Sequence, residues 1–455
     1  MSAKRQATNL GAICKFSAGS AFKPEYQGCS AGDYPFIKVS DMNAAGNEFF
    51  ITGASNYVNE LQRAAMNARL HPVGATVFAK IGVALTTNRR RLLTRPTIID
   101  NNMMSATPRD GKVTSRFLYF LLISLDFNTV SAGTALPYLN VSDLERIEVS
   151  IPETLAEQEA ISRILGDIDD KIDLNRRINQ TLEAMAQAIF KSWFVDFDPV
   201  KARIAAKAEG RDPLRAAMTA ISGKPDAELD TLPPDQFATL AATAALFPDE
   251  MEESELGEIP KGWQVKTLMQ IARFPVGKID VANVDTSTYV STENMLENRG
   301  GICEASSLPS VATVPSFSSG QVLVSNIRPY FKKIWLARFA GGRSNDVLAF
   351  QPLDGETSEF LFNLLYQDQF FEFMNRTAKG AKMPRGDKDA IAGWKCVCAD
   401  SELLRHFSEK VRPSYGFIDS LGRESKFLSA TRDALLPKLL SGELQVHNSD
   451  AEVEA

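Results

Sequence analysis

Hydrophobic residues recur at alternating spacings of four and three along two long segments, which predicts two long helices with one apolar seam each. The first segment covers residues 153–199 and the second covers residues 401–444. A helix of about 40 residues is about 60 Å long, more than a small domain needs inside itself. The seam of the first segment consists of Ile161, Leu165, Ile168, Ile172, Asn175, Asn179, Leu182, Ala186, Ile189 and Trp193.

The second seam lies 246 residues later and occupies the matching positions. Its members are Phe407, Val411, Ser414, Ile418, Leu421, Ser425, Leu428, Arg432, Leu435 and Leu439. Pro413 and Gly422 interrupt this pattern, so we expect a helix that is kinked or starts late. The two seams are the predicted interface between the helices.

Local signals place the ends of the first helix. Thr154 and Glu157 form a capping-box pattern at its start, and Asp198-Pro199 marks its end. The polar seam residues Asn175 and Asn179 are expected to fix the register of the helix pair at some cost in stability. By the repeat register they face Leu421 and Ser425.

The remaining segments alternate with a shorter period. Tyr34–Ser40 and Gly74–Ile81 have the length and the β-branched or aromatic content of strands. Residues 115–122 read as a short amphipathic helix with Ser115 as its N-cap. Many short strands with frequent glycine and proline predict an α+β lobe built on a curved or barrel-like sheet.

The order of these short elements occurs twice. Gly74–Ile81 returns as Gly320–Ile327, residues 115–122 return as 358–365, and residues 133–140 return as 380–387. A period this long indicates a duplicated domain plus helix rather than a solenoid. If a two-fold relates the copies, their helices must run antiparallel. The predicted fold is therefore α+β, with two similar lobes separated by a pair of long antiparallel helices.

This pattern divides the chain into six parts. They are lobe one (1–152), a spacer helix (153–199), a connector (200–259), lobe two (260–400), a second spacer helix (401–444) and a disordered tail (445–455). The connector is rich in alanine, proline and acidic residues, and we expect one or two short helices in it.

Composition and charge narrow the class of protein. A hydrophobic content of 44% and a charged content of 23% are typical of a soluble globular protein. No apolar run could span a bilayer and no signal peptide is evident, so we expect a cytoplasmic protein. The net charge is −6, yet residues 1–150 hold 16 basic and 11 acidic residues, whereas residues 200–259 hold 6 and 12. DNA affinity depends on such local basic regions rather than on the average.

The sequence offers no evident catalytic or metal site. Five cysteines are too few and too scattered for a disulfide framework, and Cys396-Val-Cys398 is more simply explained as buried small side chains than as zinc ligands. No phosphate-binding loop or adenine-methyltransferase motif is present. Three histidines cannot supply a catalytic constellation. We therefore expect a protein that reads a target and does not catalyse a reaction.

Several motifs resemble one known family. Ile151–Ile161, Leu174–Asn179, Leu182–Phe190 and Trp193–Pro199 are similar to the specificity (S) subunits of type I restriction-modification systems. Ser254–Trp263 looks like that family's entry into its second target-recognition domain, and Leu435–Leu444 looks like its C-terminal ending. Lobe one departs from the pattern, because it lacks the Ile-Pro-x-Gly-Trp lead that precedes lobe two.

This resemblance implies a function and a set of partners. Each lobe would read one half of a bipartite target in double-stranded DNA, and the helices would set the gap between the halves. Two methyltransferase (M) subunits, which bind S-adenosylmethionine and modify adenine, would dock on the helices. Restriction (R) subunits that need ATP and magnesium would join for cleavage, and no cofactor would bind this chain itself.

Candidate DNA-binding residues follow from chemistry and from the repeat. Phosphates are bound by lysine, arginine or backbone amides, and base edges are read by arginine, lysine, asparagine or glutamine. Three adjacent arginines next to a turn are hard to bury, although a solvated basic turn is the alternative. The predicted set is Lys80, Asn88, Arg89, Arg90, Arg91, Thr134, Tyr138 and Asn140 in lobe one, and Arg328, Lys332, Lys333, Lys379, Lys382, Arg385 and Lys388 in lobe two.

Two other classes of function compete with DNA recognition. The chain could be a self-contained nuclease with an unrecognised site, in which case it would cleave or methylate DNA alone. It could also be a coiled-coil scaffold that joins proteins without contacting DNA, which equal charge on lobes and connectors would have favoured.

Overall fold

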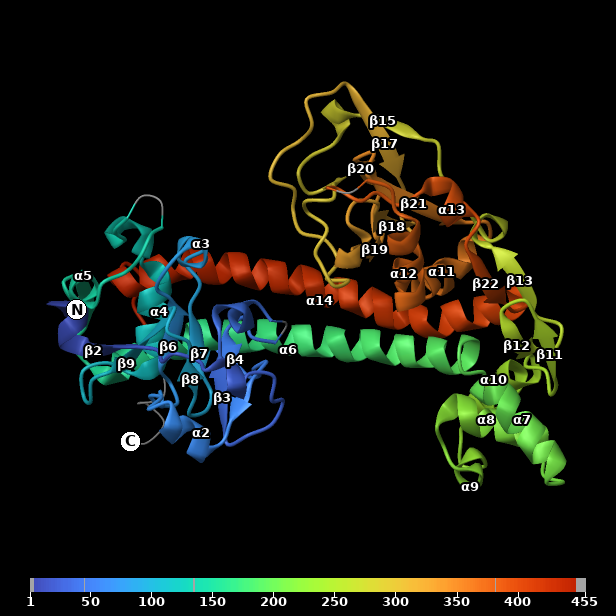
Figure 1. Ribbon diagram of the computed structural model, residues 1–455, viewed down its shortest axis with the longest axis horizontal. Coiled ribbons are helices and arrows are strands. Elements are labelled where there is room, and N and C mark those ends of the chain that lie inside the picture. Colours follow the sequence, from blue (N-terminus) through green and yellow to red (C-terminus); the bar gives the residue numbers. More distant parts are fainter. Residues whose placement is uncertain (1–3, 45, 134–135, 381, 447–455) are drawn as a thin grey trace. The chain divides into compact units, whose positions relative to one another are not determined.

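The computed structural model describes residues 4–44, 46–133, 136–380 and 382–446 (Figure 1). The chain folds into two compact units. Unit one consists of Met1–Ile178 and Leu421–Ala455, and unit two consists of Asn179–Ser420. Residues 447–455, most of the predicted disordered tail, lie outside the described residues.

Lobe one, within unit one, is built on three small sheets. Their strand orders are β2-β9-β6-β7-β4, β5-β3-β8 and β1-β10. The strands are β1 (Arg5–Asn9), β2 (Cys14–Ala18), β3 (Tyr34–Ile37), β4 (Phe50–Ile51), β5 (Tyr57–Val58), β6 (Thr76–Ala79), β7 (Arg91–Leu93), β8 (Ile98–Ile99), β9 (Met103–Pro108) and β10 (Glu148–Pro152). The pairs β3–β8 and β4–β7 are parallel, and the other pairs are antiparallel.

Five helices complete lobe one: α1 (Leu10–Ile13), α2 (Glu60–Ala65), α3 (Val83–Thr86), α4 (Ser115–Ser124) and α5 (Val141–Glu145). Helix α4 supplies the centre of the core, where Phe117, Phe120 and Leu122 are fully buried. The predicted N-cap of α4 is wrong by one residue. Thr114 caps the helix and accepts a hydrogen bond from the Phe117 amide (3.4 Å), because its backbone is extended.

Lobe two, within unit two, repeats the order of sheets. The sheet β14-β21-β18-β19 corresponds to β2-β9-β6-β7, and the pair β13–β22 corresponds to β1–β10. A further sheet has the order β15-β17-β20-β16, in which β16 and β20 are parallel, as β3 and β8 are. In the described part of both lobes the sheets are open, so the barrel-like alternative is not what the chain adopts.

The strands of unit two are β11 (Met251–Ser254), β12 (Gly257–Pro260), β13 (Gln264–Thr267), β14 (Ala272–Arg273), β15 (Lys278–Asp280), β16 (Tyr289–Val290), β17 (Thr313–Phe317), β18 (Val322–Ser325), β19 (Ile334–Leu336), β20 (Gly341–Arg343), β21 (Val347–Pro352) and β22 (Lys395–Cys398). Lobe two also contains α11 (Ser358–Tyr366), α12 (Asp368–Thr377) and α13 (Lys388–Ala392). Helix α11 lies at the repeat position of α4.

The connector is more ordered than predicted. It contains four helices rather than one or two: α7 (Asp198–Ala208), α8 (Pro213–Ser222), α9 (Asp226–Leu229) and α10 (Pro234–Ala245). Their apolar residues, including Met218 and Leu229, join the same buried cluster as Trp193 and Trp263. Short helices with proline at their starts are hard to recognise by period alone, because each holds fewer than four turns.

Two long helices, α6 (Leu155–Phe194) and α14 (Ser401–Ser441), contribute to both units. In unit one, Arg432 Nη1 donates to Asp169 Oδ1 (2.8 Å) and Asn175 Nδ2 donates to Glu424 Oε2 (2.7 Å). In unit two, Asn179 Nδ2 donates to the Ile418 carbonyl (3.4 Å), and the rings of Phe190 and Phe407 lie 5.7 Å apart. Residues further along α6 contact residues earlier in α14, so the helices run antiparallel within each unit. The predicted α+β fold with two similar lobes and a pair of long antiparallel helices is confirmed (Figure 1).

The ends of the long helices differ from the local predictions in two ways. Thr154 Oγ1 accepts from the Glu157 amide (3.3 Å), but the Glu157 carboxylate pairs with Arg5 (3.4 Å) instead of completing the capping box. Helix α14 begins at Ser401 and continues through Pro413 and Gly422, so the predicted late start is wrong. Val411 and Tyr415, on either side of Pro413, are buried, and this packing outweighs the one hydrogen bond that proline removes.

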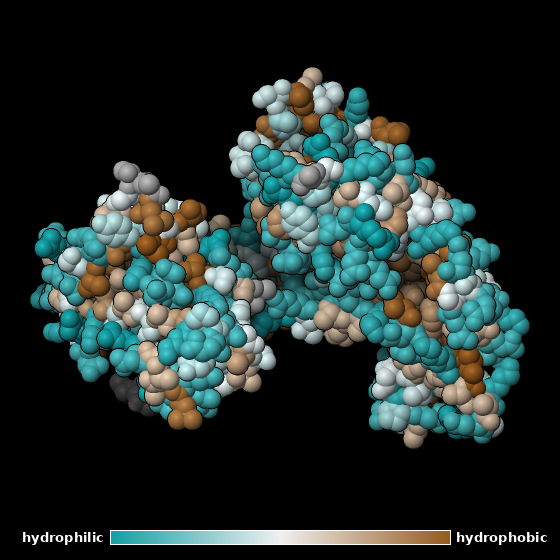
Figure 2. Space-filling view, viewed as in Figure 1, coloured by the Kyte–Doolittle hydropathy of each residue, from teal (hydrophilic) through white to brown (hydrophobic). Residues whose placement is uncertain are grey.

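The surface is mostly hydrophilic on the face shown in Figure 2, with hydrophobic residues in scattered patches. Such isolated apolar side chains are normal on a folded protein.

Candidate nucleic-acid interface

In lobe one, a closed loop docks against the chain that follows strand β6. Ala132 and Tyr138 exchange two backbone hydrogen bonds of 2.9 Å, which close the loop. The Leu139 amide donates to the Lys80 carbonyl (2.9 Å), and the Gly82 amide donates to the Pro137 carbonyl (2.8 Å). These hydrogen bonds join the two segments of lobe one that were predicted to contact DNA, which are the segment that begins at Lys80 and the loop that contains Tyr138.

Lobe two holds an equivalent loop in the same way after strand β18. Lys379 and Arg385 exchange backbone hydrogen bonds of 2.8 and 2.9 Å. The Gly386 amide donates to the Asn326 carbonyl (3.0 Å), and the Arg328 amide donates to the Pro384 carbonyl (2.8 Å). Each of these hydrogen bonds matches one in lobe one, so the duplication preserved the docking of the loop while its side chains changed.

The lobe-two loop presents a group of basic side chains to solvent. Arg328, Lys379, Lys382, Arg385 and Lys388 are all exposed. Lys379 pairs with Asp387, and Arg385 Nη2 lies 3.1 Å from Asp346 Oδ2. Ion pairs this exposed contribute little and can exchange for phosphate contacts. Arg328 and Lys382 have no polar side-chain partner within the described residues.

Two predicted residues of lobe two are used inside the lobe. Lys332 Nζ contacts Asp368 Oδ1 (2.7 Å), and Lys333 Nζ donates to the Thr292 carbonyl (2.8 Å). Asp368 also pairs with Arg299, whose Nε donates to the Tyr366 carbonyl (2.8 Å). These contacts hold the turn before β19 to helix α12 and to Thr292, and they reduce the availability of both lysines for DNA.

The arginine run of lobe one does not form the exposed patch that was predicted. Arg90 is only 2% exposed. Its guanidinium lies 3.9 Å from the centroid of the Phe127 ring, and its Nη2 donates to the Leu125 carbonyl (3.1 Å). Burial lowers the pKa of Arg90 to about 10. The assumption that three adjacent arginines cannot be buried is wrong here, because an aromatic ring and carbonyl oxygens surround this one.

Of the residues next to Arg90, Asn88 and Arg91 make contacts inside the lobe, whereas Arg89 is exposed. Asn88 adopts a φ of 56° and accepts hydrogen bonds from Arg90 and from the Phe127 amide (3.1 Å), so its side chain is structural. Arg91 Nη2 donates to the Met42 carbonyl (3.0 Å), and burial lowers its pKa. Arg89 is exposed and contacts Asn43.

The other predicted residues of lobe one lie on or beside the docked loop. Tyr138 and Asn140 are exposed, and Lys80 is half-buried. Asn140 Nδ2 donates to Asp143 Oδ2 (2.9 Å) at the start of α5. Thr134 lies outside the described residues. Arg89, Tyr138 and Asn140 are therefore the predicted residues that remain open to a ligand in lobe one.

Replacing Arg90 with alanine is expected to destabilise lobe one by about 2–4 kcal/mol, because buried carbonyl oxygens lose their donor and Phe127 loses its partner. Salt dependence of DNA binding by the folded protein should not change. Chemical denaturation measures the first effect and binding at several salt concentrations measures the second. Arg89→Ala is the matched control and should leave the unfolding free energy within about 0.5 kcal/mol. A shallower salt slope for Arg90→Ala at unchanged stability would contradict the structural role.

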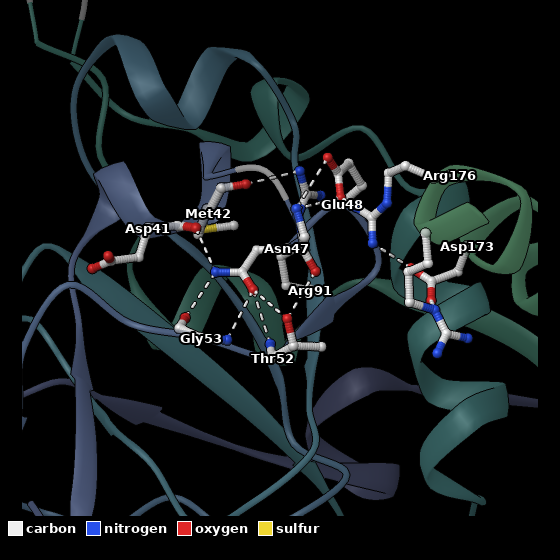
Figure 3. Close-up of polar contacts among 11 residues, drawn as sticks. Asp41, Met42, Asn47, Glu48, Thr52, Gly53, Arg91, Asp173 and Arg176 are labelled. Carbon is white, nitrogen blue, oxygen red and sulfur yellow. Dashed lines mark hydrogen bonds and ion pairs between the residues drawn. The ribbon is translucent and has the colours of Figure 1, made fainter. Parts of the chain in front are cut away.

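The sequence did not reveal how lobe one is held to helix α6. Figure 3 shows a loop before strand β4 that is organised around Asn47. Asn47 Nδ2 donates to the carbonyls of Asp41 (2.8 Å) and Gly53 (2.9 Å), and its Oδ1 accepts from the Thr52 amide (2.8 Å). Glu48 of this loop pairs with Arg176 of α6, which also binds Asp173 (2.5 Å). No periodic pattern marks such a loop, so only the tertiary structure shows it.

The predicted seam residues lie in the helix pair. Within the described part of both units, each of them is buried or half-buried. In unit one, Ile161, Leu165, Leu435 and Leu439 also join the core of lobe one. Asn175 reaches Ser425 (3.3 Å), as the repeat register predicts, whereas Asn179 donates to a backbone carbonyl instead. The remaining seam residues are Ile168, Ile172, Leu421, Leu428 and Arg432 in unit one, and Leu182, Ala186, Ile189, Trp193, Phe407, Val411, Ser414 and Ile418 in unit two.

No group of three or more histidine, cysteine or acidic residues in the described ranges could hold a metal ion. No helix among them is both long and apolar enough to cross a membrane. Cys396 and Cys398 are buried with their sulfur atoms 3.7 Å apart.

Comparisons with known proteins agree with the fold. Residues 5–184 match the type I restriction modification DNA specificity domain. The specificity subunit of the type I restriction enzyme HindI from Haemophilus influenzae is 28% identical over 76% of this chain and 81% of its own length. The MjaIX specificity subunit from Methanocaldococcus jannaschii is 25% identical over 96% and 92%.

Solved structures that are similar along nearly the whole chain include one with the same fold. It is the crystal structure of a type I restriction-modification S subunit from M. genitalium, with a TM-score of 0.51, 15% identity and coverage of 96% of both chains. At this identity the likeness concerns the fold. The duplicated lobes, the two long helices and the matches along the sequence lead to one conclusion: residues 5–184 match the DNA specificity domain of type I restriction-modification systems, and the chain as a whole is similar to the specificity subunits of such systems.

Proposed function

We propose that this chain reads a bipartite sequence in double-stranded DNA and directs adenine-methyltransferase and restriction subunits to it. The observation that carries the proposal is the docked loop that both lobes hold in the same way, after β6 and after β18. Its exposed side chains differ between the lobes, with Tyr138 and Asn140 in one and Lys379, Lys382 and Arg385 in the other. A shared backbone frame with different polar side chains suits two lobes that read two different half-sites.

The chemistry of the assembly is expected to come from its partners. The chain carries none of the sequence motifs for binding ATP or for methylating adenine. We therefore propose that it is not catalytic, that the methyltransferase subunits bind S-adenosylmethionine, and that the restriction subunits bind ATP and magnesium.

The helix pair offers a surface for the methyltransferase subunits. Polar residues of α6 contact a lobe in each unit, as Arg176 with Glu48 and Gln187 with Asn363 illustrate. Each helix also has a flank of exposed apolar residues that lie 10 or 11 residues apart. They are Ile164, Leu174 and Phe427 in unit one, and Met185 and Phe417 in unit two. Phe427 is 71% exposed and Phe417 is 50% exposed, which is unusual for phenylalanine unless a partner covers it.

Replacing Phe417 and Phe427 with glutamate is expected to weaken association with the methyltransferase subunit at least tenfold, because aromatic anchors dominate such interfaces. Analytical ultracentrifugation or calorimetry of the purified subunits measures this. The control replaces Ala184 and Ala430, which are exposed at outward positions of the same helices, with glutamate. If both double variants associate as the parent does, this flank is not the methyltransferase surface.

Mapping methylated adenines tests the function as a whole. We expect cells that express this chain with its methyltransferase subunit to methylate one bipartite motif with a fixed gap, and cells without the chain to lose that methylation. Cleavage or methylation of DNA by the purified chain alone would favour a self-contained enzyme. Assembly without any binding of DNA by the complex would favour a scaffold.

A further inference from the structure

Lobe one contains an open recess of about 550 Å³ that the proposed function does not use. It is lined by residues of β2, residues 69–72 and residues 107–110. Residues 107–110 include the end of β9, whereas the docked loop binds beside the start of that strand, where the Lys80 amide donates to the Asn102 carbonyl (2.9 Å). A strand of six residues spans about 20 Å, so the recess is a separate site on the lobe.

The register of the sheet gathers polar side chains on one face of the recess. Lys15 lies opposite Thr107, and Ser17 lies opposite Ser105, in the antiparallel pair β2–β9. Side chains opposite each other in such a pair share a face of the sheet. His71 lines the same recess and is bound through Nδ1 to Ser105 Oγ (2.7 Å).

His71 is unusual because it is a buried polar residue with one ring nitrogen that lacks a hydrogen-bond partner in the described part of the chain. It is 1% exposed, and its Nε2 has no hydrogen-bond partner within the described residues. A buried polar nitrogen without a partner is costly, unless a ligand supplies one. Burial, with a smaller effect of Arg69, lowers the pKa of His71 to about 4, so the imidazole is neutral near pH 7.

Three cationic side chains surround the recess. Lys15, Arg69 and Arg109 are exposed, and Asp110 is the acidic residue among the lining residues. Lys15 and Arg69 have no polar side-chain partner in the part of the chain that the structure describes, and Arg109 Nε donates to the Gly11 carbonyl (3.0 Å). The recess therefore has an excess of positive charge that no internal carboxylate neutralises.

Lobe two shows that the fold does not require these polar residues. His71 pairs with Thr97 through the backbone, and Phe317 pairs with Gly341 at the equivalent place. Ser105 lies opposite Val77, and Ala349 lies opposite Leu323 in the same relation. The histidine and serine of lobe one thus correspond to phenylalanine and alanine in lobe two, where the position is part of an apolar core.

We propose that this recess binds a phosphate group, carried either by a small phosphorylated molecule or by the backbone of DNA outside the half-site that lobe one reads. Arginine and lysine supply the charge, and the hydroxyls of Ser17 and Thr107 supply neutral donors. Its volume is within the range of small-molecule sites. The proposal does not depend on the docked loops being the site of base recognition.

The first test uses the full chain and inorganic phosphate, with thermal unfolding at constant ionic strength. Phosphate is expected to raise the midpoint of the parent. Lys15→Ala with Arg69→Ala should weaken phosphate binding at least tenfold. The control, Lys23→Ala with Arg95→Ala, removes the same charge elsewhere on lobe one and should respond as the parent does. His71→Phe, which installs the residue of lobe two, should also weaken binding, and it reports on the site without removing a surface charge.

The second test distinguishes the two sources of phosphate. It compares a duplex that ends at the bipartite target with one that extends well beyond it, both bound by the complex with the methyltransferase subunits. If DNA is the source, Lys15→Ala with Arg69→Ala lowers affinity for the long duplex only, and its salt slope falls by up to about two units. If a small molecule is the source, only the phosphate response changes. Identical behaviour of this double variant and its control in both tests would overturn the proposal.

Discussion

Replacing Lys379, Lys382 and Arg385 together with alanine is expected to weaken binding of target DNA by the assembled complex about a hundredfold. Removing three side chains that each contribute about 1 kcal/mol of binding free energy corresponds to roughly two decades in affinity. The loop itself should keep its shape, because its closing hydrogen bonds join backbone atoms of residues 379 and 385. The ion pairs of Lys379 and Arg385 are exposed, so their removal should change the unfolding free energy little.

Fluorescence anisotropy over a series of salt concentrations measures this prediction. Removal of a side chain that binds phosphate should reduce the salt slope by about one unit, whereas removal of one that binds a base edge lowers affinity with less change in slope. The control replaces Arg273, Lys278 and Lys410, which are exposed on unit two away from the loop, with alanine. An equal decrease of affinity in this control would mean that charge in general, and not the loop, determines binding.

Replacing Arg432 with alanine is expected to destabilise unit one by about 3–5 kcal/mol, because it leaves a buried carboxylate without its partner. Asp169 is 1% exposed, and Arg432 Nη1 lies 2.8 Å from its Oδ1 within the seam of the helix pair. Burial already raises the pKa of Asp169, and Arg432 opposes that effect. Urea denaturation of the full chain measures the loss of stability, with Lys438→Ala, at an exposed pair with Glu443, as the control.

The pH dependence of Arg432→Ala follows from the same carboxylate. Without Arg432, the pKa of Asp169 in the folded state rises further above its unfolded value, so folding binds a proton. Stability of the variant should therefore increase as the pH falls from 7 towards 5, and decrease again as it rises. A second variant, Asp169→Leu with Arg432→Met, removes both charges and should recover most of the parent stability. A single variant as stable as the parent at pH 7 would show that the pair does not hold the helices together.

The correction of Arg90 illustrates what local sequence cannot supply. The run Asn88–Arg91 reads as an exposed basic turn, because arginine is seldom buried. Phe127 and Leu125, which enclose the Arg90 guanidinium, lie more than thirty residues away in the sequence. In lobe two the predicted loop stays exposed, because its lysines and arginine are held at the surface by a loop closed through the backbone. Exposed basic side chains were thus predicted in both lobes. Contacts between residues far apart in the sequence decided that Arg90 is buried in lobe one and that the loop of lobe two is exposed.

The sequence by itself determined the features that repeat with a fixed period. The seams of α6 and α14 and the duplicated order of short elements are local or internal patterns, and burial of an apolar stripe leaves a helix little choice of face. Tertiary structure decided which polar groups became partners, namely Glu48 with Arg176 and Asp169 with Arg432. It also decided that α14 continues through Pro413. Such contacts depend on where chain segments meet in space, and the free energy of packing there can outweigh the preference of any single residue.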